Sequence, residues 1–120
     1  IELTIDHLKS RKAFGGVLWD KQVTRHRMAW AQTNVDAARE LMYRAAWLEE
    51  QGADSVRMVS EVKALAGETA KEVIDDCVQF HGGMGYIAET EVERLYRDTR
   101  IQAIGGGATE VMLEEVAKRL

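Results

Sequence analysis

Apolar residues recur every three or four positions through two long stretches of the chain, which is the spacing of one helix face. The first stretch extends from about Asp20 to Gln51, and its stripe consists of Ala31, Val35, Ala38, Met42, Ala45 and Leu48. The second extends from about Asp54 to Phe80, and its stripe consists of Val59, Val62, Ala66, Ala70, Val73, Cys77 and Phe80. The pattern predicts two long amphipathic helices, with Gly52 closing the first.

Glycine marks two further features of this helical pattern. Residues 1–13 have the spacing of a helix end, and the Gly15-Gly16 pair is expected to close it, because glycine readily adopts the left-handed conformation of a helix C-cap. Gly67 falls inside the second long helix, where it costs up to about 1 kcal/mol relative to alanine. We interpret Gly67 as the place where another helix crosses closely.

Two shorter helices are predicted in the last third of the chain. Thr90 and Glu93 have the spacing of a capping box, so a helix is expected to begin at the residue after Thr90 and to end before the glycines at 105–107. Thr109 is a suitable N-cap for a last helix that reaches the end of the chain. No stretch alternates convincingly at a period of two. The predicted fold class is all-α: an antiparallel four-helix up-and-down bundle with two long central helices, formed by residues 1–120 as one domain.

The composition agrees with a folded helical domain. The chain has 120 residues and no proline, the residue that usually marks turns and extended linkers. Apolar residues make up 46% and charged residues 30%, a balance that is too apolar for intrinsic disorder. The sequence starts at Ile1 with neither a methionine nor a signal-like stretch, so we expect it to be part of a longer protein.

Charge and cysteine content exclude several classes of protein. The formal net charge is −4, which lacks the basic footprint expected of a nucleic-acid-binding domain. No apolar run is long enough to span a membrane. Cys77 is the only cysteine, so no internal disulfide can form, and its place on an apolar stripe predicts a buried, inert thiol.

Metal-dependent and carboxylate chemistry receive no support from residue spacing. His7, His26 and His81 are scattered, and none forms a pair at helical spacing with a third ligand, so we interpret them as surface or packing residues and predict no metal site. Acidic pairs such as Glu49-Glu50 and Asp75-Asp76 are adjacent in sequence and therefore point to different sides of a helix. We interpret them as solvated faces.

Two glycine clusters and one arginine are the remaining candidates for ligand binding. Residues 82–85 follow a helix and residues 105–107 precede one, and glycine lets a ligand approach the backbone closely. Arg11 precedes the break at Gly15, where a guanidinium could clamp a diphosphate in a two-pronged manner. Ordinary turn glycines and a surface arginine stabilised by the helix dipole explain the same residues. Spacing does not separate these alternatives.

Four motifs occur in a set order along nearly the whole chain. They are Arg11-Lys12-Ala13-Phe14-Gly15 followed by Gln22, then Gln79-Phe80-His81-Gly82-Gly83-Met84-Gly85-Tyr86, then Glu93-Arg94-Leu95-Tyr96-Arg97-Asp98, then Ile104-Gly105-Gly106-Gly107-Ala108-Thr109-Glu110. In this order and spacing the chain resembles the C-terminal domain of the acyl-CoA dehydrogenases. Several linked motifs are far more specific than a glycine cluster alone.

The resemblance implies a flavoenzyme built from three domains, of which this chain is the last. Such enzymes use FAD to oxidise an acyl-CoA thioester to the trans-2-enoyl-CoA and pass the electrons to an electron-transfer flavoprotein. Their C-terminal helical domains form the centre of a homodimer or homotetramer, with FAD at a subunit interface. The resemblance also implies a cytoplasmic location in a bacterium or the mitochondrial matrix in a eukaryote.

The same resemblance assigns cofactor-binding roles to particular residues. Arg11 would lie on the FAD pyrophosphate of a neighbouring subunit, with Phe14 in the same motif and Gln22 nearby. Gln79, Gly82 and Gly83 would line the ADP portion of the cofactor. The segment from Gly106 to Glu110 would also touch FAD, and its candidate residues are Thr109 and Glu110.

The chain departs from the family pattern at two positions. Many members carry the catalytic glutamate in a Tyr-Glu-Gly-Thr segment, and here Gly106 stands at that position, so no catalytic residue is assigned within this chain. The long-chain and isovaleryl-type members place the base on an earlier helix, which would lie upstream of Ile1. Ala108 stands where a threonine is usual, and the adjacent Thr109 is the candidate to supply that hydroxyl.

Three hypotheses follow for the function of the chain. The first is a flavin-contacting and oligomerisation domain of an acyl-CoA dehydrogenase, which would be inactive in isolation. The second is a helical association module without a ligand, since the apolar stripes and three tryptophans also suit helix–helix partners. The third is a base-less subunit of a heteromeric relative, which Gly106 leaves open.

Overall fold

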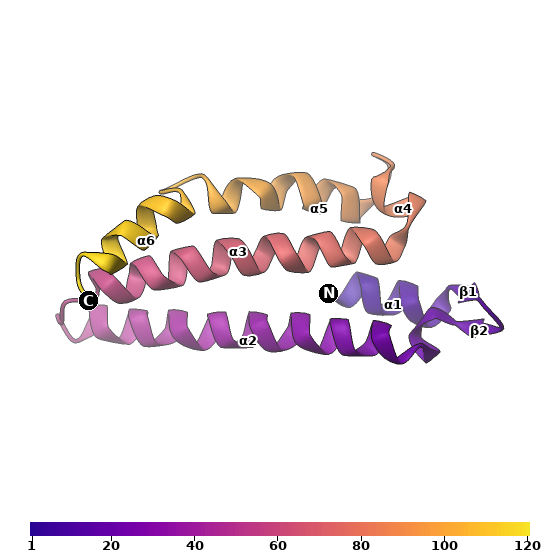
Figure 1. Ribbon diagram of the computed structural model, residues 1–120, viewed down its shortest axis with the longest axis horizontal. Helices are drawn as coiled ribbons and strands as arrows, with labels where there is room; N and C mark the ends of the chain where they lie inside the picture. The colour runs from indigo at the N-terminus through magenta and orange to yellow at the C-terminus, as the bar shows by residue number, and fades with distance from the viewer.

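The two long helices predicted from the apolar stripes are both present and run in opposite directions side by side (Figure 1). In this computed structural model, which describes residues 1–120, they are α2 (Gln22–Glu50) and α3 (Val56–His81). Gly52 has a φ of +67° between them, and the Ala53 amide donates a hydrogen bond to the Leu48 carbonyl, which closes the turn. The glycine predicted to end α2 therefore occupies a backbone conformation that suits glycine.

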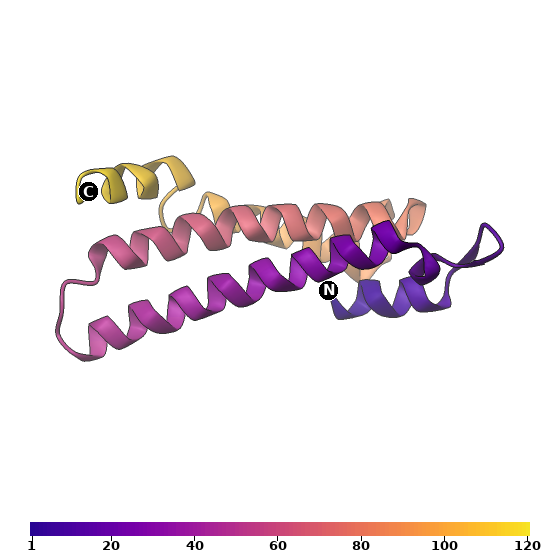
Figure 2. The ribbon, with the colours of Figure 1, turned by 60° about the horizontal axis from the view of Figure 1, so that its bottom comes forward.

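Shorter elements flank this pair at both sides. The first is α1 (Glu2–Ser10), and the last part of the chain consists of α5 (Glu91–Arg100), the 3₁₀ turn η2 (Ile101–Ala103) and α6 (Thr109–Ala117). The chain direction alternates through α1, α2, α3 and the α5–α6 segment (Figures 1 and 2). The all-α prediction is confirmed. The helix α1 lies beside only part of the long pair, so the up-and-down arrangement is four helices wide at one end.

A small β-hairpin follows α1 where the sequence predicted helix up to residue 13. The helix ends at Ser10, and β1 (Lys12–Ala13) pairs in antiparallel fashion with β2 (Gly16–Val17). The two central turn residues, Phe14 and Gly15, have φ values of +53° and +79°. A two-residue turn of this kind matches the twist of the paired strands. Asparagine or glycine normally marks its first position, so phenylalanine there concealed the hairpin from the sequence pattern.

The hairpin is held to the start of α2 by polar contacts. The 3₁₀ turn η1 (Leu18–Asp20) connects them, and the Asp20 carboxylate accepts a hydrogen bond of 2.9 Å from the Val17 amide. Lys21 Nζ donates to the Phe14 carbonyl oxygen at 3.2 Å. A Cβ at Gly16 would lie 2.5 Å from Asp20 Oδ2, so a larger residue there would displace the Asp20 carboxylate from this contact.

The end of α3 is continued by a short helical turn and not by an open loop. Gly82, with a φ of +59°, terminates α3, and α4 (Gly83–Tyr86) follows it directly. A Cβ at Gly85 would collide with the backbone of Val78, so α4 folds back closely on α3. The sequence predicted the break correctly and missed the turn, because a single helical turn has no periodicity.

Two predicted helix caps form differently from the sequence expectation. The helix α5 begins at Glu91 as predicted, but the Thr90 hydroxyl donates to the Ile87 carbonyl and the Glu93 carboxylate binds Arg97, so no capping box forms. The N-cap of α6 is Ala108, because the hydroxyl of Thr109 is directed at α3 instead. Neither helix therefore has a side-chain hydrogen bond at its N-cap. The helix α6 ends at Ala117, whereas the sequence predicted a helix that continues to the end of the chain.

The helix α3 is central, whereas α2 lies at one side of the bundle. Within the chain, α3 packs against α1, α2, α4, α5, η2 and α6, while α2 contacts chiefly α3. A Cβ at Gly67 would lie 3.1 Å from Ala103 Cα, so the prediction of a close approach at Gly67 is confirmed. Its neighbour is the 3₁₀ turn η2 and not the crossing α-helix that was expected.

The buried core is small and lies at the α1 end of the bundle. Its centre consists of Leu8, Met28 and Ala31, with Val73 and Phe80 among the half-buried residues around it. Cys77 is buried as predicted. On α3 the most buried positions include the small residues Ser60 and Ala64 rather than the larger members of the predicted stripe.

Much apolar surface remains uncovered along the rest of the bundle. The accessible surface is 7909 Å², against about 6,500 Å² for a compact monomer of this mass. The radius of gyration is 17.1 Å, against about 13.6 Å for a compact domain of this length. Large exposed side chains include Met42, Tyr43, Trp47, Val59, Leu65 and Leu113. The chain is therefore shaped to be covered by other protein surface.

Candidate functional site

The three N-terminal cofactor candidates lie at the end of the bundle that carries the hairpin. Arg11 is the residue after α1, and its amide donates to the His7 carbonyl at 2.8 Å, which fixes its backbone. Its guanidinium is exposed and forms no hydrogen bond or ion pair within the chain. Phe14 stands at the hairpin tip with 85% of its surface exposed, and Gln22 is the exposed first residue of α2.

The second group of candidates, Gln79, Gly82 and Gly83, lies at the end of α3 and therefore at the same end of the bundle (Figure 1). Gln79 is in the last turn of α3 and is exposed. A Cβ added at Gly82 or Gly83 would meet nothing within 4 Å, so the backbone here is open to a group from outside the chain. An exposed cation near open glycine backbone suits an anionic ligand such as a diphosphate.

Two histidines that appeared scattered in sequence are stacked between these groups. The His7 ring on α1 lies over the His81 ring on α3, with 4.3 Å between centroids and 26° between planes. His81 Nδ1 lies 2.9 Å from the Cys77 carbonyl oxygen. Burial lowers the pKa of His7, and electrostatic repulsion from His81 and Arg11 lowers it further. The neutral form of His7 is therefore favoured, and the Arg11 guanidinium is one of the charges that favours it.

The third group of candidates lies further along the bundle, where the glycine segment joins η2 to α6. The Thr109 hydroxyl donates to Glu68 Oε1 at 2.8 Å, and Lys71 Nζ donates to Glu68 Oε2 at 2.7 Å. These two hydrogen bonds lower the pKa of the Glu68 carboxyl. Glu110 is exposed in the first turn of α6 and has no partner in the chain.

Gly106 and Gly107, which precede α6, have φ values of +70° and +115°. This conformation strongly favours glycine at both positions. A Cβ at Gly106 would lie 3.8 Å from Lys63 Cε on α3, and one at Gly107 would lie 2.6 Å from Met112 Cε. A side chain at position 106 would thus point toward a lysine of the same chain.

The structure separates the glycine segment from the other candidates. Glu68, which holds Thr109, and Gln79 are eleven residues apart on α3, a rise of about 16 Å. The predicted cofactor residues therefore form two groups on one chain, Arg11 to Gly83 at the end and Thr109 with Glu110 along the side. No group of three or more histidine, cysteine, aspartate or glutamate side chains is placed to hold a metal ion.

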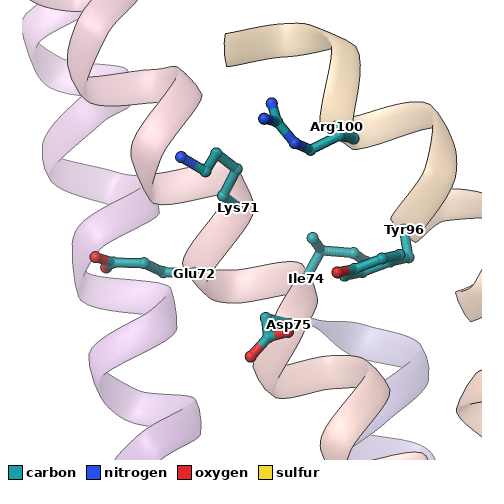
Figure 3. A pocket seen from close by; sticks show the side chains of 6 residues that line it. All are labelled: Lys71, Glu72, Ile74, Asp75, Tyr96 and Arg100. Atoms are coloured by element: carbon teal, nitrogen blue, oxygen red, sulfur yellow. The ribbon is translucent and has the colours of Figure 1, made fainter. Parts of the chain in front are cut away.

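One cavity between α3 and α5 was not anticipated from the sequence (Figure 3). Its volume is about 310 Å³, and its lining residues are Lys71, Glu72, Ile74, Asp75, Tyr96 and Arg100. The basic groups of Lys71 and Arg100 lie toward one end and Asp75 toward the other, with the Tyr96 ring beside Ile74. The only available signal was the i,i+4 spacing of these residues on each helix. Because both charge signs line it, the cavity does not select an anion or a cation.

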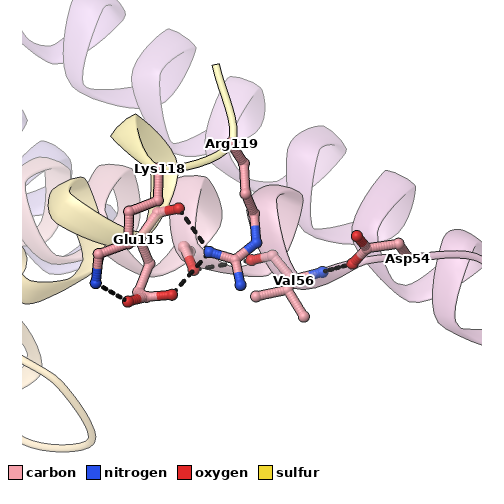
Figure 4. Close-up of polar contacts among 6 residues, drawn as sticks. Asp54, Val56, Glu115, Lys118 and Arg119 are labelled. Atoms are coloured by element: carbon pink, nitrogen blue, oxygen red, sulfur yellow. Dashed lines mark hydrogen bonds and ion pairs between the residues drawn. The ribbon is translucent and has the colours of Figure 1, made fainter.

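A second, apolar hollow lies between α2, α3 and α6. Its volume is about 440 Å³, and its lining residues include Leu41, Leu65, Leu113 and Val116. Beyond it, the end of α6 carries an exposed cluster in which Glu115 binds both Lys118 and Arg119, near the start of α3 (Figure 4). Hydrogen bonds from Lys118 and Arg119 lower the pKa of Glu115. Such surface pairs contribute little stability, so the apolar hollow is the more informative feature.

Comparison with known proteins gives a consistent result. The family model described as "Acyl-CoA dehydrogenase, C-terminal domain" matches residues 1–120. The rat protein named short/branched chain specific acyl-CoA dehydrogenase, mitochondrial, is 34% identical over 119 residues, which is 99% of this chain and 28% of that protein. A crystal structure of acyl-CoA dehydrogenase from Geobacillus kaustophilus superposes with a TM-score of 0.94 at 34% identity, covering 98% of this chain and 31% of that one.

A third similarity concerns a flavoprotein structure. The FAD complex of PigA superposes with a TM-score of 0.92 at 25% identity, covering 98% of this chain and 31% of that one. The chain spans about a third of the length of the curated relatives that it matches. None of its helices combines the length and the apolar character needed to cross a membrane.

Proposed function

Because this chain belongs to the acyl-CoA dehydrogenase family, whose C-terminal domain it matches from end to end, we propose that it is the flavin-contacting and subunit-joining domain of an acyl-CoA dehydrogenase. The whole protein would oxidise an acyl-CoA to the trans-2-enoyl-CoA and deliver the electrons to an electron-transfer flavoprotein. When bound, FAD supplies the electron acceptor for this oxidation. The proposed location is the cytoplasm of a bacterium or the mitochondrial matrix.

The observation that carries the cofactor proposal is the Arg11 guanidinium, which has no partner within the chain. Arg11 directly follows α1 and Gly82 directly follows α3, and both helices end at the hairpin end of the bundle, where the backbone of Gly82 and Gly83 is open. We assign Arg11 to the cofactor diphosphate, with the exposed Phe14 and Gln22 beside it. Gln79 and the two glycines would contact the ADP portion. The residues present therefore fit an anionic, extended cofactor.

The role of this domain in assembly is supported by its uncovered apolar surface. An accessible surface of 7909 Å² and the apolar hollow at Leu41, Leu65 and Leu113 support contact of this domain with other protein surface. We propose a homodimer or homotetramer in which the long helices provide much of the contact. A strict monomer of the full-length protein in size-exclusion chromatography with light scattering would overturn this part.

The cofactor proposal is tested by replacing Arg11 with alanine in the full-length protein. The loss of a charge-assisted contact to a diphosphate is expected to weaken FAD binding by roughly ten- to a hundredfold. Arg94 is the matched control, because it is also exposed and forms only a surface pair with Glu91 at 3.6 Å. Equal FAD affinity of Arg11→Ala and Arg94→Ala would remove the assignment.

Catalysis by the chain alone is not expected. Gly106 cannot accept a proton, and we propose, from the family resemblance, that the base that removes the thioester α-proton comes from a helix upstream of Ile1. Turnover of acyl-CoAs by the 120-residue chain with a dye acceptor, at rates typical of enzymes, would contradict the proposal.

The uncovered surface also favours the second candidate, an association module without a ligand. That candidate predicts no thermal shift of the full-length protein with millimolar FAD.

A further inference from the structure

The glycine segment before α6 is clamped to α3 by three contacts. Lys63 Nζ donates a hydrogen bond to the Gln102 carbonyl, and Gly67 receives the backbone of Ala103 closely. At the next residue of α3, Glu68 Oε1 accepts a hydrogen bond of 2.8 Å from the Thr109 hydroxyl. The connection from η2 to α6 is therefore fixed at its start, by the contacts to Gln102 and Ala103, and at its end, by the contact to Thr109.

The bond to Glu68 also determines what the Thr109 hydroxyl can do. A hydroxyl has one proton to donate and two lone pairs that accept. Within the chain this proton faces Glu68 Oε1, and the only other acceptor near it is the Ala103 carbonyl at 3.5 Å. Toward any group outside the chain the hydroxyl is left with lone pairs only.

Glu68 is kept in the ionised form that this role needs. Hydrogen bonds from Lys71 and Thr109 lower its pKa, and the charge of Arg100 acts in the same direction. An ionised carboxylate only accepts hydrogen bonds, so it cannot donate a proton to Thr109 and reverse the polarity. The orientation of the threonine hydroxyl is therefore set by charge as well as by geometry.

We propose that Glu68 is a positioning residue that fixes the segment 102–109 against α3 and makes the Thr109 hydroxyl a hydrogen-bond acceptor toward the cofactor. The group it would face on the ligand is an N–H or O–H donor, and not a carbonyl or phosphate oxygen. This inference rests on the proposed function, because the assignment of residues 106–110 to FAD contact comes from the family. Glu68 itself is not placed in contact with the cofactor.

The test uses the full-length protein with the single variants Glu68→Gln, Glu68→Ala, Thr109→Val and Thr109→Ser, and with the double variant Glu68→Ala/Thr109→Val. Glu72→Gln is the matched control, since Glu72 lies one turn further along α3, is exposed and has no partner in the chain. Amide hydrogen exchange of residues 102–109 in the apoprotein reports the clamp. Titration with FAD reports the contact, and its pH dependence reports the ionisation of Glu68.

The expected result is that Glu68→Ala and Thr109→Val each raise exchange in this segment several-fold without changing exchange elsewhere on α3. The double variant is expected to raise exchange of residues 102–109 no further than Glu68→Ala alone, because Glu68→Ala already removes the bond to Thr109 as well as the bond to Lys71. Thr109→Ser and Glu72→Gln should behave as the wild type. FAD affinity should fall roughly three- to tenfold in Glu68→Ala and Thr109→Val.

The pH dependence of FAD affinity distinguishes the proposed role of Glu68 from a purely structural one, because a purely structural role would not make FAD affinity depend on the ionisation of Glu68. FAD affinity of the wild type should fall as the pH drops through the lowered pKa of Glu68, and Glu68→Gln should remove that pH dependence. Additive effects or unchanged exchange would overturn the clamp. Increased exchange with unchanged FAD affinity would retain the clamp and overturn the cofactor contact of this segment, which separates the two failures.

Discussion

Replacing Gly67 with alanine is expected to destabilise the chain, although alanine is the better helix former. In a helix interior the change from glycine to alanine by itself stabilises by about 1 kcal/mol. At this position the new Cβ would lie 3.1 Å from Ala103 Cα and 3.4 Å from the Gln102 carbonyl oxygen. These are backbone atoms, so they cannot move aside by changing a rotamer.

The size of the effect follows from the balance of these two contributions. Overpacking of this kind costs about 1–3 kcal/mol, and contact with backbone places it in the upper part of that range. The net loss is then about 1–2 kcal/mol in the free energy of unfolding, with the displacement falling on η2 and the start of the glycine segment. The hydrogen bond from Lys63 to Gln102 is expected to be lost first.

Urea denaturation at a fixed protein concentration measures this loss as a lower midpoint with an unchanged slope. The control is Ala66→Gly, at the exposed neighbouring position on α3, where only helix propensity acts and about 1 kcal/mol should be lost. If Gly67→Ala instead stabilised the protein by about the amount that Ala66→Gly costs, the close approach of η2 to α3 would be refuted.

Three further predictions concern the core, the histidine pair and the glycine segment. Leu8→Ala, at a side chain with no exposed surface, should cost about 2–5 kcal/mol in denaturation, whereas Leu3→Ala at an exposed position should cost far less. Because the pKa of His7 is lowered in the folded state, its contribution to stability is present above pH 6.5 and is lost as the pH falls through the folded-state pKa. The melting temperature should therefore drop on acidification, and His7→Gln should reduce that drop. Gly106→Glu should lower the free energy of unfolding by about 1–2 kcal/mol, because position 106 has a φ of +70°. In the full-length protein it should add no turnover, because the new side chain would point toward Lys63. A gain in turnover would contradict this placement.

The periodicity of apolar residues was enough to predict the long helices and their turn at Gly52, because these depend on local spacing. It could not predict the hairpin, whose turn residues Phe14 and Gly15 do not have the usual asparagine–glycine signal. The caps at Thr90 and Thr109 failed for a related reason. A side chain near a helix terminus binds whichever partner lies closest, and Glu68 is 41 residues away from Thr109 in the sequence.

The candidate site also has features that follow from local spacing and features that depend on how the helices pack. An alternating bundle brings the start of α2 and the end of α3 to one end, so Arg11 and Gly82 were expected to lie together once the fold was known. The stacking of His7 on His81 and the cavity at Tyr96 and Arg100 depend on how far α1 and α5 extend along α3. Sequence spacing within each helix contains no information about that relative placement.

The helix α3 connects the two groups of candidate residues, because it contains Gln79 of the first group and Glu68, which binds Thr109 of the second. Its length therefore sets the distance between the two groups. A deletion of one residue between Thr69 and Val78 would shorten this interval by about 1.5 Å and turn one group by about 100° relative to the other. Substitutions along this stretch can be absorbed by the neighbouring side chains, but a change in its length cannot. Among all segments of the chain, this one should tolerate an insertion or a deletion least.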